Sequence, residues 1–119
     1  MGQGCAVAVW EPQPYWGPEL QRQLGALGVR VFRWDGHSMI RSVEVGQVVV
    51  TVAERGLVPL AELRDWVAEG IRVHLVLDSS LEDLRWFLYE LGATSVFDFG
   101  EARRGLALAV DQIFTNKVV

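Results

Sequence analysis

Three polar residues that are able to bind a cation or accept a phosphoryl group come at the ends of apolar runs. Glu11 follows the first of these runs, Thr51 lies near the end of the third, and Asp78 ends the fourth. A cation such as Mg²⁺ takes several oxygen ligands, usually with one or two carboxylates among them, at about 2.0 to 2.6 Å. Whether Glu11 and Asp78 can share such an ion therefore depends on the elements that position them.

Other catalytic or cofactor-binding patterns are missing from the sequence. Gly2 and Gly4 precede the first apolar run, whereas a dinucleotide fingerprint places three glycines after a strand. The chain has no P-loop, HExxH zinc motif or nucleophile elbow. His74 lies in the middle of an apolar run, where we expect a buried histidine with a hydrogen-bond partner. We therefore predict that the chain is not an enzyme and has no cofactor and no metal site.

Composition limits the class of protein further. With 119 residues, of which 50% are hydrophobic and 22% charged, residues 1–119 are expected to form a single globular domain. The net charge of −4 argues against nucleic-acid binding, which needs a basic surface. The N-terminus has no basic segment before its short apolar run, so we predict no signal peptide, no membrane association and a cytoplasmic location. Cys5 is the single cysteine, which excludes an internal disulfide, and we expect it to be buried.

Short apolar runs alternate with helical patterns along the whole chain. The predicted strands are CAVAVW (5–10), VRVFRW (29–34), VVVTV (48–52), VHLVLD (73–78) and TSVFDF (94–99). The predicted helices cover 16–27, a short segment at 38–43, 59–69 with Pro59 in the first turn, 80–91 with Ser80 and Asp83 as a capping box, and 101–114. Strands joined by helices pair in parallel and are buried on both faces. We therefore predict an α/β fold, a three-layer doubly wound (βα)5 sandwich.

The order and spacing of these elements resemble a known family. WEPQP before a leucine-striped helix, LVLDSS after the fourth strand, and LGA before TSVFDF are similar to the receiver domains of bacterial two-component response regulators. The resemblance covers essentially the whole chain. It implies a flavodoxin-like fold with strand order 2-1-3-4-5, and a group of five residues at the strand ends that binds magnesium and accepts a phosphoryl group on an aspartate.

Most of these five functional positions differ in this chain. The acidic pair falls on Glu11 and Pro12, the phosphoacceptor aspartate on Thr51 or the residue after it, the switch Ser or Thr on Asp78, and the lysine on Phe99. With this strand order Glu11 and Asp78 start about 10 Å apart, which is twice the strand spacing. The resemblance therefore predicts a degenerate receiver, or pseudo-receiver, that lacks both the acceptor aspartate and the lysine.

Some large side chains fall on the polar side of a predicted helix. At about 100° per residue, Trp86 and Tyr89 lie with Glu90 away from the leucine stripe of the fourth helix. Leu108 lies beside Arg104 on the polar side of the last helix. Trp, Tyr and Arg are the residue types that most often anchor interfaces. In receiver domains the corresponding face is the usual surface for dimers and partners.

These observations lead to one preferred function and one alternative. The preferred function is a phosphorylation-independent interaction module that binds another signalling protein or a second copy of itself. The alternative is a module that binds a small ligand or cofactor at an aromatic edge formed by Trp10, Trp34 and Phe99. The absence of a phosphate-binding glycine loop argues against an anionic ligand there.

Overall fold

The computed structural model describes residues 5–36, 40–41 and 44–117, with the side chains of 111–117 left aside. Its centre is a parallel sheet in the order β2-β1-β3-β4-β5. The strands are β1 (Ala6–Trp10), β2 (Val31–Arg33), β3 (Val45–Val52), β4 (Arg72–Leu77) and β5 (Ser95–Asp98). The predicted strand order and doubly wound, flavodoxin-like architecture are therefore confirmed.

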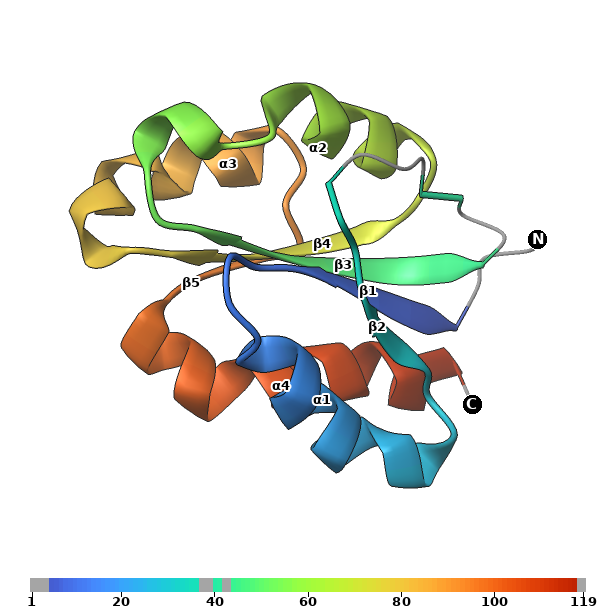
Figure 1. The fold of residues 1–119 in the computed structure, drawn as a ribbon. Helices are drawn as coiled ribbons and strands as arrows, with labels where there is room; N and C mark the ends of the chain where they lie inside the picture. The colour runs from blue at the N-terminus through green and yellow to red at the C-terminus, as the bar shows by residue number, and fades with distance from the viewer. Residues whose placement is uncertain (1–4, 37–39, 42–43, 118–119) are drawn as a thin grey trace.

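Helices cover both faces of this sheet (Figure 1). The α-helices are α1 (Trp16–Leu24), α2 (Leu60–Ala68), α3 (Arg85–Glu90) and α4 (Phe99–Lys117), and the 3-10 helices are η1 (Gly25–Leu27), η2 (Arg55–Leu57) and η3 (Ser79–Leu84). In Figure 1, α2 and α3 lie on one face of the sheet while α1 and α4 lie on the other. This arrangement gives the three predicted layers.

The valines of β3 show why the sheet is buried on both faces. Val48 and Val50 pack in the core beneath α2 and α3, whereas Val49 packs in the core beneath α1 and α4. Successive residues of a strand point to opposite faces, so a strand covered on both sides needs an apolar residue at almost every position. The uninterrupted VVV run meets this requirement.

His74 links the sheet to α4 through a buried polar chain, as the prediction of a hydrogen-bonded core histidine required. Its Nε2 lies 2.6 Å from Gln47 Oε1, its Nδ1 lies 3.1 Å from Ser95 Oγ, and Gln47 Nε2 donates to the carbonyl of Val110 at 3.3 Å. Because the Gln47 amide nitrogen donates to Val110, its oxygen accepts from His74 Nε2–H. His74 Nδ1 then accepts from Ser95. Burial, with a smaller effect of Arg72, lowers the pKa of His74 to about 4.

Several local predictions are wrong. The helix expected at 38–43 falls mostly outside the described residues, and Ile40 and Arg41, which are described, are not helical. Pro59 lies at the N-cap of α2 instead of in its first turn. The only cysteine, Cys5, is exposed because it precedes β1 instead of lying within it.

The fourth predicted helix begins differently from the predicted capping box. The carboxylate of Asp78 accepts from the backbone N–H of Ser80 at 3.0 Å and from its hydroxyl at 2.5 Å. This local turn starts the 3-10 helix η3, in which Leu81 has a non-helical φ of −105° and ψ of 15°. A regular α-helix therefore forms only from Arg85 onward. Among the described helices, none is long and apolar enough to cross a membrane.

Candidate functional site

A cavity of about 410 Å³ opens at the carboxyl end of the sheet, beside the loop that joins β1 to α1. Six of the residues that line it are Glu11, Pro12, Tyr15, Trp16, Thr51 and Phe99. We call this the edge cavity. It brings together four of the five sequence-predicted positions, Glu11, Pro12, Thr51 and Phe99, at the edge where ligands of doubly wound folds bind.

Glu11 holds the start of α1. Its Oε1 accepts from the backbone N–H of Trp16 and its Oε2 from that of Gly17, both at 2.8 Å. The side chain is buried, with 4% of the residue exposed. The first amides of a helix lack partners within the helix and carry partial positive charge, so a carboxylate is a favourable partner for them. This carboxylate therefore serves as a helix cap.

Phe99 does not end a strand, because β5 stops at Asp98 and α4 begins at Phe99. The Phe99 ring packs against Tyr15 and Trp16, with ring centroids 5.5 Å and 5.3 Å apart. Phe99, the residue that the resemblance aligns with the family's lysine, is thus part of an aromatic cluster. This side of the edge cavity is apolar.

Asp78 lies apart from the edge cavity lining. It follows β4, and its backbone N–H donates to the carbonyl of Val52 at 3.0 Å. Hydrogen bonds from the hydroxyl and backbone N–H of Ser80 lower the pKa of Asp78. Asp78 and Glu11 are therefore each held by local backbone groups, one at the start of η3 and the other at the start of α1.

These contacts limit what the edge cavity does chemically. The described residues contain no group of three or more His, Cys, Asp or Glu side chains arranged to hold a metal ion. Thr51 lines the edge cavity, but its Oγ1 is buried and has no hydrogen-bond partner among the described residues. The wall of the edge cavity therefore contains aromatic rings, prolines and one carboxylate, that of Glu11, which is already hydrogen-bonded to α1.

Comparisons with known proteins bear on the fold. Neither a protein-family model nor a curated protein sequence matches the chain. The non-phosphorylated HemR receiver domain from Leptospira biflexa superposes with a TM-score of 0.72 at 13% identity, covering 91% of this chain and 92% of that one. This chain has the receiver-domain fold.

Two further solved structures are similar. The receiver domain of the Francisella response regulator 1452 matches with a TM-score of 0.66 at 8% identity, covering 96% of this chain and 99% of that one. A CheY-like response regulator from Mesorhizobium loti matches with a TM-score of 0.62 at 18% identity, covering 92% and 98%. At such low identity the likeness concerns the fold alone.

The five residues predicted to form an interaction face lie in two places on this receiver fold. Trp86, Tyr89 and Glu90 are exposed on α3, and Trp86 is 78% exposed. Arg104 and Leu108 instead line a cavity of about 250 Å³ with residues of α1 and η1. α3 and α4 cover opposite faces of the sheet (Figure 1). Helical periodicity shows which residues of one helix face outward, but it does not show where two helices lie relative to each other.

The aromatic edge proposed for a ligand is also divided. Trp10 and Trp34 line a cavity of about 510 Å³ together with Arg33 and Asp35. Phe99 lines the edge cavity. The two groups of rings therefore belong to different hollows of the surface, although both lie near the carboxyl end of β1.

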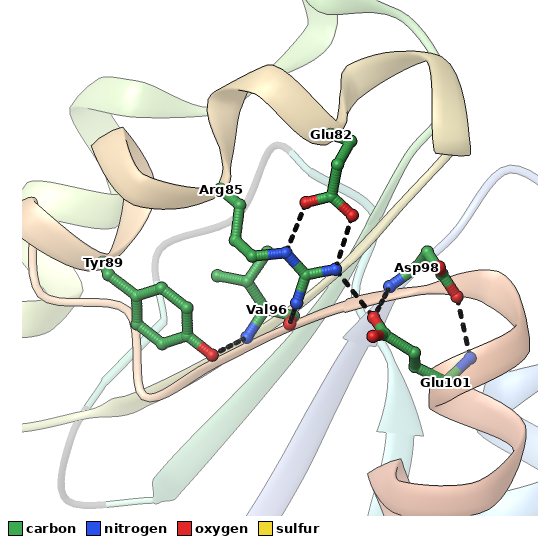
Figure 2. A network of polar contacts seen from close by, with 6 residues as sticks. All are labelled: Glu82, Arg85, Tyr89, Val96, Asp98 and Glu101. Carbon is green, nitrogen blue, oxygen red and sulfur yellow. Dashed lines mark hydrogen bonds and ion pairs between the residues drawn. The ribbon is translucent and has the colours of Figure 1, made fainter.

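A polar network that we did not predict covers the outer edge of β5 (Figure 2). The hydroxyl of Tyr89 accepts from the backbone N–H of Val96 at 3.1 Å, and Arg85 Nη1 donates to the carbonyl of Val96 at 2.6 Å. Arg85 also pairs with Glu82 and, at 2.7 Å, with Glu101. These side chains form hydrogen bonds with backbone groups of an edge strand. Without them, the same groups would be free to pair with another strand.

The same network begins α4. The Asp98 carboxylate accepts from the backbone N–H of Glu101, and the Glu101 carboxylate accepts from that of Asp98, each at 2.8 Å. This reciprocal pair is a capping box, and the sequence DFGE carries its signature. Hydrogen bonds from Arg85, followed by that from the Asp98 backbone, lower the pKa of Glu101.

Proposed function

We propose that this chain is a phosphorylation-independent interaction module with a receiver fold, acting in bacterial signal transduction in the cytoplasm. The observation that carries the proposal is that the Glu11 carboxylate accepts hydrogen bonds from two backbone amides of α1. Glu11 is the one acidic residue at the positions of the family's acidic pair. Withdrawing it to bind a cation would leave two helix N–H groups without a partner. Each such loss costs about 1 to 3 kcal/mol when the group is buried.

Electrostatics in the edge cavity supports the same proposal. A phosphoryl group on Thr51 would carry a charge of about −1.5 to −2 at neutral pH. The charged residue among those lining this cavity is Glu11, which is an anion. The lysine that would neutralise the phosphoryl group in a receiver domain is replaced by Phe99. Phosphorylation would therefore place two negatively charged groups together in an apolar setting.

Binding would occur through the exposed aromatic residues of α3. Trp86 is 78% exposed, and Phe87 and Tyr89 are 46% and 39% exposed. Large aromatic side chains grouped on one surface are typical of interface anchors. The partner is another signalling protein or a second copy of this chain, and nucleic acid and membrane are not proposed as partners.

Incubation with acetyl phosphate and Mg²⁺, followed by intact mass measurement, tests independence from phosphorylation. We expect no gain of a phosphoryl group. A Thr51→Asp variant is measured beside the wild type, since it restores a carboxylate at the acceptor position. Stoichiometric phosphorylation of the wild type would contradict the proposal.

Sedimentation velocity tests the version in which the chain binds itself. We expect the wild type to associate with rising concentration and the Trp86→Ala variant to remain monomeric. Leu57→Ala is a matched control, because Leu57 is also exposed but lies on η2. A wild type that stays monomeric would exclude self-association, and equal association in Trp86→Ala would show that α3 is not the interface.

A further inference from the structure

A hollow of the surface lies between α4 and the end of α1, on the face of the sheet opposite to α3 (Figure 1). Its volume is about 250 Å³, and we call it the arginine cavity because the charged residues among those lining it are Arg103 and Arg104. Leu27 and Leu108 also line it and are 62% and 57% exposed. Pockets for small ligands usually measure about 300 to 1,000 Å³. The arginine cavity is therefore better matched to one large side chain than to a ligand.

The two arginines of this cavity lack an acidic partner among the described side chains. Neither Arg103 nor Arg104 forms an ion pair with one of them, whereas Arg22, Arg55 and Arg85 each do. An arginine without such a partner is available to pair across an interface, where Arg is one of the residue types that contribute most. Two cationic groups beside two exposed leucines favour a partner that combines an apolar side chain with negative charge.

The α3 surface has the complementary combination. Trp86 is 78% exposed, and Glu90 follows it by four residues, so both lie on the same side of the helix. Glu90 is exposed and forms no ion pair with a described side chain. Residues 79–90 carry three acidic side chains and one arginine. α3 therefore presents one large apolar ring next to an excess of negative charge.

We propose that α3 of one copy of this chain docks into the arginine cavity of a second copy. The Trp86 indole enters the cavity between the two exposed leucines, and Glu90 faces the two arginines. A guanidinium group over an indole ring adds a cation–π attraction. This inference rests on the proposed function, because it takes the version in which the chain binds itself and names the surface that receives α3.

The positions of the two surfaces decide the kind of assembly. α3 and the arginine cavity lie on opposite faces of the sheet, so α3 cannot reach the cavity of its own chain (Figure 1). The contact is therefore heterologous, and each added copy leaves one α3 free at one end and one cavity free at the other. A symmetric dimer through α3 would instead bring two acidic surfaces together, which is electrostatically unfavourable. We expect head-to-tail chains that grow with protein concentration.

Sedimentation velocity of single variants tests both surfaces, with circular dichroism to check that each variant is folded. Trp86→Ala removes the ring, and Leu108→Glu places a carboxylate in the arginine cavity, so each variant alone should associate about tenfold or more weakly than the wild type. Leu57→Glu is the matched control, because Leu57 is 54% exposed on η2, and it should associate like the wild type. Raising NaCl from about 0.05 to about 0.5 M should weaken wild-type association several-fold.

An equimolar mixture of Trp86→Ala and Leu108→Glu separates the head-to-tail arrangement from a symmetric one. The first variant has an intact arginine cavity and the second has an intact α3, so one contact forms between them. The resulting pair has the altered α3 at one end and the altered cavity at the other. We therefore expect the mixture to form dimers that do not grow further, although each variant alone associates only weakly.

A mixture that associates no more than the separate variants would overturn the head-to-tail proposal. If Leu108→Glu alone associates like the wild type while Trp86→Ala does not, α3 pairs with another α3, so the proposed function stands and this inference fails. If the wild type does not associate at all, this inference fails and only the version with another signalling protein as partner remains.

Discussion

Lowering the pH from about 7.5 to about 5 should destabilise this protein through the protonation of His74 in the unfolded chain. The side chain is fully buried and neutral, and burial lowers its pKa from the ordinary value of 6.5 to about 4. Between these two values the unfolded chain binds a proton that the native state does not. Stability therefore falls as the pH falls through this window, and the contribution is constant above about pH 7.5.

The size of the effect follows from the two pKa values. A shift from 6.5 to about 4 amounts to about 3 kcal/mol when complete, at 1.36 kcal/mol for each factor of ten. Only part of it is reached at about pH 5, where linkage gives a loss of about 2 kcal/mol. The carboxylates with lowered pKa values, such as Glu101 and Asp78, contribute mainly below their ordinary values of 4.5 and 3.8. They add little in this window.

Urea unfolding followed by circular dichroism at a series of pH values measures the effect. With a typical dependence on urea, a loss of about 2 kcal/mol lowers the midpoint by about 1 to 2 M. The His74→Gln variant replaces the imidazole with an amide that does not titrate, and it retains His37, the second histidine in the sequence. Its stability should be nearly independent of pH across the window. A variant with the same slope as the wild type, or a wild type that loses less than about 0.5 kcal/mol, would refute the assignment.

Three further substitutions test local contacts by their effect on the free energy of unfolding. Glu11→Gln replaces one acceptor oxygen with an amide donor facing the first N–H groups of α1, and should cost about 1 to 3 kcal/mol in chemical denaturation; a neutral result would mean that the cap is not needed. Tyr89→Phe removes the acceptor for an outward-facing N–H of β5 and should cost about 1 kcal/mol, with faster amide exchange at that strand; unchanged exchange would contradict the sealed edge. Gly92→Ala should cost about 1 to 3 kcal/mol in thermal unfolding, because Gly92 has φ +109° and a Cβ there would lie 2.7 Å from Val67 Cγ1. The control Gly56→Ala, which has open space around it, should be close to neutral. Equal effects at both glycines would contradict this reasoning.

Much of the architecture was predictable because it depends on properties that repeat along each element. The valines at 48–50 indicate a strand buried on both faces, and the helices between strands require parallel pairing. Periodicity also identified Trp86 as an outward-facing residue of its helix, and Leu108 likewise. These features are local, so the order of residues is sufficient to predict them.

The candidate site was predictable only in part. The sequence placed Glu11, Thr51 and Phe99 at the ends of elements, and the structure brings all three to one cavity. The sequence did not show that the loop of residues 12–15 turns the first amides of α1 back onto the Glu11 carboxylate. A hydrogen bond of this kind depends on the path of a loop, which has no periodic pattern.

By itself, the sequence determined the layers of this protein, its parallel sheet and the exposure of Trp86. Only the tertiary structure decided that Glu11 caps a helix, that Arg104 lies away from Trp86, and that side chains of α3 seal the edge of β5. The physical reason is that hydrophobic burial follows the repeat of a single helix or strand, whereas hydrogen bonds between distant groups depend on how several elements are placed together.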